Sequence, residues 1–276
     1  MKLSRAALGL VGVRWYSYSD GEGRRLLGDP AWALSLSYLA AIGAAEAVTA
    51  LYDLQLGVIF HALLMGLLLL HSALVGPSPL QRLLLTLALA PLVRIVSLGL
   101  PLAPFPQVYW YLLTGAPLVA AAVVAMWVLG TPWRAVGLSL RGWAWQPPLA
   151  LAGVGFGAAE FYILRPVPLI AEMEWRQALL PALILFLATG FAEELLFRGV
   201  VQRAALDALG IGGLVYGALL FAILHLGYLS ALDVAFVFGV GLLFAVAVYK
   251  TGSLAGATLS HGLTNIFLFL VFPFLL

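Results

Sequence analysis

Two adjacent glutamates and an arginine lie inside the otherwise apolar segment FAEELLFRGV, residues 191–200. An ionisable side chain at membrane depth costs roughly 2.5–3.5 kcal/mol on insertion scales, so each one needs a partner or a chemical task. Glu194 and Arg198 are four residues apart, which predicts an ion pair along one helix face. Glu193 is rotated by about 100° from Glu194 around the same helix. It therefore stays available for chemistry such as proton transfer.

Two further polar segments follow the glutamates. Glu193 lies 17 residues before the glycine-rich turn that begins at Gly210, and His225 lies 15 residues after it. An antiparallel helical hairpin would bring both side chains to nearly the same depth. His261 and Asn265, again four residues apart, share one face of a later helix. Histidine and asparagine can also serve only as packing hydrogen bonds in a membrane interior. Three segments that converge on one leaflet favour a functional site.

The composition predicts what must position these side chains. The chain is 63% hydrophobic and 9% charged, with a mean hydropathy of +1.06. Apolar runs of membrane-spanning length recur, and no alternating strand pattern appears. We therefore predict an all-α fold, a polytopic transmembrane helical bundle of about eight or nine spans. The expected spans are 32–50, 56–75, 83–100, 109–129, 147–164, 178–200, 214–229, 232–249 and 254–275.

The basic residues predict the orientation of the bundle. Only Arg165 and Arg176 fall in the predicted outer loops. A cytoplasmic N-terminus places eleven basic residues inside: Lys2, Arg5, Arg14, Arg24, Arg25, Arg82, Arg134, Arg141, Arg198, Arg203 and Lys250. This bias also accounts for the net charge of +2 without nucleic acid as a partner. We expect a multi-pass protein of the prokaryotic cell membrane, and an N-terminal segment, residues 1–27, that lies at the membrane interface and is not a cleaved signal.

A stretch rich in Trp and Arg, residues 131–148, divides the chain and is predicted to lie along the interface. Residues 1–146 then form an N-terminal transmembrane region of unassigned role. Residues 147–276 contain all three polar segments. The absence of cysteine excludes disulfides, thiolate metal sites and cysteine nucleophiles.

The three segments together resemble the motifs of the CAAX-processing and bacteriocin-processing (CPBP) intramembrane endopeptidases, which include the CAAX prenyl endopeptidase. The matching segments are EELLFR at 193–198, FAILH at 221–225 and HGLTN at 261–265, the last after a TGSL turn. The resemblance covers roughly 147–275, so residues 147–276 are expected to form a CPBP-type intramembrane protease core. It implies a membrane-associated protein or peptide substrate, which could be cleaved near its C-terminus or be prenylated.

Peptide hydrolysis needs an activated water and a stabilised oxyanion. Glu193 could act as the general base, and His225 could hold and polarise the water. His261 and Asn265 could then donate hydrogen bonds to the oxyanion. The resemblance implies the same division of roles. It assigns Glu194 and Arg198, which the i, i+4 spacing joins, to the support of the site.

Two alternatives remain open from the sequence. Glu193, His225 and His261 could bind zinc with one position left for water, although the HExxH helix typical of such proteases is missing. The resemblance implies a family that uses glutamate without a bound metal, so we expect no cofactor. A non-catalytic transporter or immunity-type binding protein could also place such residues in a membrane. The discontinuous helices and paired repeats typical of transporters are not apparent in the sequence.

Other polar residues lie in predicted spans. Glu46 and Arg94 occupy the first and third spans at similar depth, so we predict that they pair between helices. His61 and His71 share the second span and are interpreted as interior hydrogen-bonding groups. For Glu160, an outer vestibule and a pair with a nearby arginine both remain open.

Overall fold

The computed structural model describes residues 30–276, and all regular structure in this part of the chain is helical. Eight helical stretches are long and apolar enough to cross a membrane, which confirms the all-α polytopic prediction. The predicted interfacial segment at residues 1–27 lies outside the described residues.

Five helices form the N-terminal half: α1 (Pro30–Leu51), α2 (Leu54–Val75), α3 (Pro79–Leu87), α4 (Leu89–Gly99) and α5 (Gln107–Val128). The side chain of Asp53 caps α2 by accepting the Leu56 N–H at 2.7 Å. One predicted span is divided into α3 and α4. Pro91 has no N–H to bond the carbonyl four residues earlier, so the helix is interrupted there.

The Trp- and Arg-rich connection contains a short 3-10 turn, η2 (Trp143–Trp145). This connection is hydrogen-bonded to the turn at residues 252–254, which precedes the helix that begins at Ala255. The Ser139 hydroxyl donates to the Gly252 carbonyl at 2.8 Å, and the Leu254 N–H donates to the Gly137 carbonyl at 2.8 Å. The connection is therefore held against the C-terminal half rather than being a loose linker.

The C-terminal half is built around one long helix of five consecutive segments: α7 (Trp175–Ile184), η3 (Leu185–Phe191), α8 (Ala192–Glu194), η4 (Leu195–Val201) and α9 (Gln202–Leu209). Around it lie α6 (Gln146–Leu164), η5 (Gly210–Gly212), α10 (Gly213–Ile223), η6 (Leu226–Tyr228), α11 (Ala231–Thr251), α12 (Ala255–Ile266), η7 (Phe267–Val271) and α13 (Phe272–Leu275).

The turn that ends the long helix explains the span count. Gly210 has a φ of +64°, a conformation that favours glycine, and reverses the chain after α9. The helical stretch Trp175–Tyr228 therefore contains two of the predicted spans, 178–200 and 214–229. The second of them is short, because α10 has only 11 residues and rises about 16 Å.

Wide helical turns flank the two adjacent glutamates. Segments η3 and η4 are π-helical, and α8 between them holds the glutamates. The Ala192 N–H, for example, bonds the Leu187 carbonyl five residues back. Such turns are rare in helices and are frequent at functional sites.

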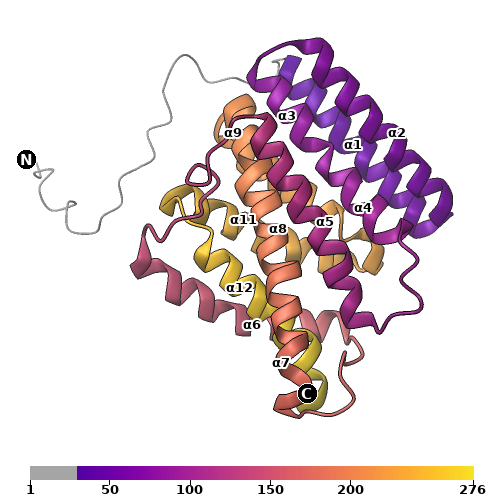
Figure 1. Ribbon diagram of the computed structural model, residues 1–276, viewed down its shortest axis with the longest axis vertical. Coiled ribbons are helices and arrows are strands. Elements are labelled where there is room, and N and C mark those ends of the chain that lie inside the picture. The colour runs from indigo at the N-terminus through magenta and orange to yellow at the C-terminus, as the bar shows by residue number, and fades with distance from the viewer. Residues whose placement is uncertain (1–29) are drawn as a thin grey trace, which may run out of the picture.

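Figure 1 shows the long helix in the middle of the bundle, with the indigo and purple N-terminal helices on one side of it and α12 with α6 on the other. Helix α12 packs on both α6 and η3. Its approach to η3 requires glycine, because a Cβ on Gly190 would lie 2.8 Å from the backbone nitrogen of Gly262. This close contact brings the His261 turn of α12 against the glutamates.

Candidate active site

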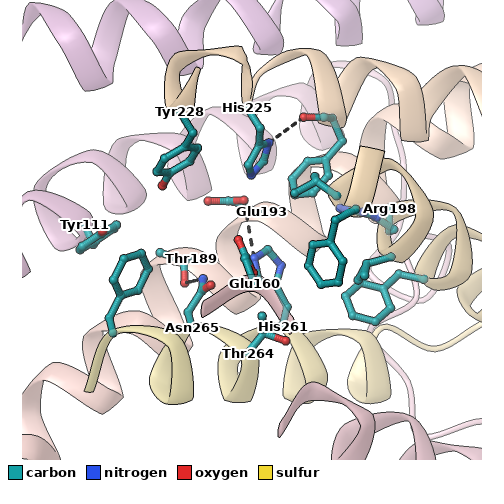
Figure 2. A pocket seen from close by; sticks show the side chains of 16 residues that line it. Tyr111, Glu160, Thr189, Glu193, Arg198, His225, Tyr228, His261, Thr264 and Asn265 are labelled. Atoms are coloured by element: carbon teal, nitrogen blue, oxygen red, sulfur yellow. Dashed lines mark hydrogen bonds and ion pairs between the residues drawn. The ribbon is translucent and has the colours of Figure 1, made fainter. Parts of the chain in front are cut away.

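One cavity gathers the four predicted catalytic side chains. Glu193 from α8, His225 after α10, and His261 with Asn265 from α12 all line it (Figure 2). Its volume is about 80 Å³, which is space for a few water molecules. Segments that are distant in the sequence therefore converge on one small polar cavity.

Glu194 is fully buried and lies between two cationic or donor groups. Its Oε1 is 3.0 Å from Arg198 Nη1 and 2.9 Å from His261 Nδ1. The guanidinium of Arg198 also lies 4.2 Å from the centre of the Phe221 ring. The ion pair predicted from the i, i+4 spacing is confirmed, and Glu194 has a second contact that the spacing did not predict.

Glu193 is the more accessible of the two carboxylates, since 31% of its side chain is exposed against 0% for Glu194. Its Oε2 lies 3.8 Å from His261 Nε2. The two glutamates therefore face different surroundings, as predicted, but His261 touches both. In Figure 2 the His225 and His261 rings approach Glu193 from opposite sides.

The ring of His225 has a defined orientation. Its Nδ1 lies 3.0 Å from the Phe221 carbonyl, and since a carbonyl only accepts, Nδ1 must carry the hydrogen. In the neutral ring, Nε2 is then an acceptor. The ring also stacks on Tyr228, with centroids 6.0 Å apart and planes at 28°. His225 can thus accept a hydrogen bond from a water molecule in the cavity.

Asn265 is held by a residue that the sequence reasoning missed. Its amide Nδ2 donates to the Thr189 hydroxyl at 2.8 Å, and that hydroxyl donates to the Leu185 carbonyl. An amide nitrogen has two hydrogens, so this bond uses one of them. The available signal was spacing, because Thr189 precedes Glu193 by four residues on the same long helix.

Three further ionisable residues that line the cavity were not assigned to the site. Tyr111 comes from α5, in the region with no family motif, and Tyr228 comes from the turn after His225. Glu160 comes from α6 and is 8% exposed. Neither reading from the sequence placed Glu160 in the candidate active site, where the structure has it. The nearby Arg165 instead lies over the rings of Phe161 and Tyr162.

The zinc alternative requires three ligands around one point. Among residues 30–276, no group of three or more His, Cys, Asp or Glu side chains is arranged to hold a metal ion. Nδ1 of His261 contacts Glu194 and Nδ1 of His225 contacts a backbone carbonyl, so each ring has only Nε2 free toward the cavity. That no cofactor is needed stays a prediction.

The chain is similar to a known family over part of its C-terminal half. Residues 175–267 match the family model described as type II CAAX prenyl endopeptidase Rce1-like. This range contains all three polar motifs, and the match confirms the resemblance noted from them. It supports an intramembrane CAAX-type endopeptidase in general. Comparisons with curated proteins and with solved structures gave no significant match.

Proposed function

We propose that this protein is an intramembrane endopeptidase that hydrolyses a peptide bond of a membrane-associated protein or peptide with glutamate-activated water. The observation that carries the proposal is the shared cavity, in which Glu193, His225, His261 and Asn265 meet although they come from three separate segments. A carboxylate, an acceptor imidazole and two possible oxyanion donors form a complete set for hydrolysis without a covalent intermediate.

Water activation follows from the two acceptors. Glu193 can accept one hydrogen of a water molecule, and Nε2 of His225 can accept the other because Nδ1 is bonded to the Phe221 carbonyl. The oxygen lone pair of that water is then directed at the scissile carbonyl. As the O–C bond forms, Glu193 takes the proton, which is general-base catalysis.

Oxyanion stabilisation is assigned to the other two groups. His261 donates Nδ1–H to Glu194, so it can also donate from Nε2 only as an imidazolium. The carboxylates of Glu194 and Glu193 at 2.9 Å and 3.8 Å would balance that charge. Asn265 keeps a second amide hydrogen besides the one given to Thr189. Two donors of this kind can stabilise the tetrahedral intermediate.

Collapse of the intermediate completes the reaction. The C–N bond breaks, and the proton held by Glu193 passes to the leaving nitrogen. One water is consumed, and the products are a carboxylic acid and an amine, which then exchange a proton to give a carboxylate and an ammonium group. Every step uses side chains of this chain, and we propose that no metal takes part.

Substrate access must widen the cavity, because about 80 Å³ is too small for a peptide segment. Tyr228 and Leu229 follow His225 closely in the chain and are 50% and 65% exposed, so we propose that substrate enters past them. We propose that the N-terminus is cytoplasmic, as the distribution of Lys and Arg supports, and that the substrate is cleaved near its C-terminus with a prenyl group attached.

The experiment compares two neutralised carboxylates in one cavity. Purified wild type, Glu193→Gln and Glu160→Gln are incubated with an internally quenched peptide that ends in a farnesylated CAAX sequence, and with the same peptide unmodified. Glu193→Gln should abolish cleavage, whereas Glu160→Gln should retain it, because only Glu193 is assigned as the base. Full activity in folded Glu193→Gln would exclude the mechanism. Equal cleavage of both peptides would exclude a role for the prenyl group.

A further inference from the structure

A buried polar cluster joins three helices of the N-terminal half. Glu46 on α1 is 1% exposed and His61 on α2 is 0% exposed. Arg94 on α4 donates its Nε–H to Glu46 Oε1 at 2.5 Å, and His61 Nε2 lies 3.4 Å from the same oxygen. The predicted pair of Glu46 and Arg94 is confirmed. His61 is buried as predicted, but neither of its ring nitrogens makes a hydrogen bond, so its interpretation as a hydrogen-bonding group is not confirmed.

The same arginine contacts the end of α10, the helix that precedes the proposed catalytic residue His225. Arg94 Nη2 donates to the carbonyl of Leu224, the C-cap residue that follows α10. Carbonyls in the last turn of a helix lack an intrahelical partner, and a cation there is also favoured by the helix dipole. The planar guanidinium donates hydrogen bonds from different nitrogens to Glu46 and to the Leu224 carbonyl, so Arg94 connects α1 to the end of α10.

The Leu224 carbonyl is next to His225 in the chain. The carbonyl of Leu224 and the N–H of His225 belong to one planar peptide unit, so fixing the carbonyl fixes the direction from which the His225 side chain starts. His225 has left the helical conformation, with φ −95° and ψ 1°, and its N–H bonds the Ala222 carbonyl at 2.9 Å. The regular helix ends before His225, so the contact from Arg94 restrains the peptide that precedes it.

We propose that Arg94, oriented by Glu46, is a positioning residue for His225, so that the N-terminal half takes part in catalysis although it lies outside the matched residues 175–267. The inference rests on the proposed function of His225. Arg94 itself is not among the residues that line the cavity in the described part of the chain. Its effect therefore has to pass through the Leu224 peptide.

A purely structural role is the competing explanation, and the chain offers a matched control. The Tyr38 hydroxyl and His71 Nδ1, 2.9 Å apart, join the same helices α1 and α2 without touching the cavity. Tyr38→Phe removes this polar contact. If the N-terminal half serves only to hold the bundle, Tyr38→Phe and Arg94→Met should lower activity only in proportion to the folded protein that remains.

The kinetic test uses the farnesylated quenched peptide and purified folded protein. Arg94→Met should lower kcat by about tenfold to a hundredfold with little change in KM. Displacement of a catalytic group slows the chemical step but does not weaken substrate binding. Arg94→Lys should restore part of the rate. Since Arg94→Met leaves Glu46 buried without its cation, the double variant Glu46→Gln/Arg94→Met serves if the single one does not fold. Unchanged kcat in either folded variant overturns the proposal.

A readout that does not depend on the substrate is hydrogen–deuterium exchange. Arg94→Met should raise exchange in the segment 222–230, while the turn at 205–215 stays at the wild-type rate. Tyr38→Phe should change neither segment. Unchanged exchange at 222–230, or a uniform increase over the whole chain, would contradict positioning. This outcome is separate from failure of the proposed function, which would appear as equal cleavage by wild type and Glu193→Gln.

Discussion

Replacement of Arg198 by methionine tests whether the buried ion pair holds the catalytic helix. Arg198 is 3% exposed at its side chain and Glu194 0%, and the two are four residues apart on the long helix. Methionine has a similar length and keeps apolar contact with Phe221, whose ring centre lies 4.2 Å from the guanidinium. The substitution therefore removes mainly the charge, and leaves Glu194 with His261 as its remaining contact.

The expected cost follows from burial. Removing one partner of a buried pair typically costs about 3–5 kcal/mol. Arg198 Nη1 lies 3.0 Å from Glu194 but makes no aligned hydrogen bond, so we expect the lower end, about 3 kcal/mol. That corresponds to more than about a hundredfold in the ratio of folded to unfolded protein. The double variant Glu194→Gln/Arg198→Met should recover much of it, because glutamine still accepts a hydrogen bond from His261.

The same helix contains an internal control. Arg203 and Asp207 are also four residues apart, but their side chains are 39% and 26% exposed and the contact is 3.6 Å. Arg203→Met should cost less than Arg198→Met, because exposed pairs on helices typically contribute only about 0.3–0.5 kcal/mol. Both variants are unfolded by titration with SDS in mixed micelles and followed by tryptophan fluorescence. If Arg198→Met and Arg203→Met lower the free energy of unfolding by the same amount, the buried pair of Glu194 and Arg198 does not stabilise the site.

Three further outcomes test the remaining chemistry and the orientation. If Asn265 is an oxyanion donor, Asn265→Ala should lower kcat by roughly a hundredfold or more. Thr189→Val should lower kcat by less, because Thr189 only holds the Asn265 amide. Equal kcat in the Asn265→Ala variant and the wild type would exclude the donor role. A chelator should leave peptide cleavage unchanged, whereas a loss restored by zinc would assign the cavity to metal chemistry. Single cysteines placed by Arg141→Cys and Lys250→Cys should react only with a cytoplasmic reagent and one placed by Pro104→Cys only with an outer reagent; outer labelling at position 250 would reverse the topology.

Interactions within one helix or between helices of known direction could be predicted from the sequence. The pair of Glu194 and Arg198 follows from a four-residue spacing, and the pair of Glu46 and Arg94 follows from matched depths in two spans. Both depend on the helical rise and on hydrophobic periodicity. The all-α bundle is predictable for the same reason, since an apolar run of sufficient length in lipid leaves the backbone few alternatives.

Contacts that depend on how helices rotate against one another could not be predicted. His261 meets Glu194, and Asn265 meets Thr189, because α12 packs tightly on η3 through Gly190. The wide turns of η3 change the direction of its side chains relative to a regular helix. Neither the rotation nor the wide turn has a simple sequence signature, so Glu194 was assigned only one partner and Thr189 none.

The contact between Arg94 and Leu224 could not be predicted from the sequence either, because it involves the backbone. Its acceptor is a main-chain carbonyl, which every residue has, so no residue type at position 224 could identify it. A motif records the side chains that perform chemistry, whereas the groups that orient them can bond to any backbone. Tyr111 lines the cavity and Arg94 bonds the Leu224 carbonyl beside it, both from helices outside the matched range. The N-terminal helices can therefore hold catalytic geometry without sharing any motif with the residues they position.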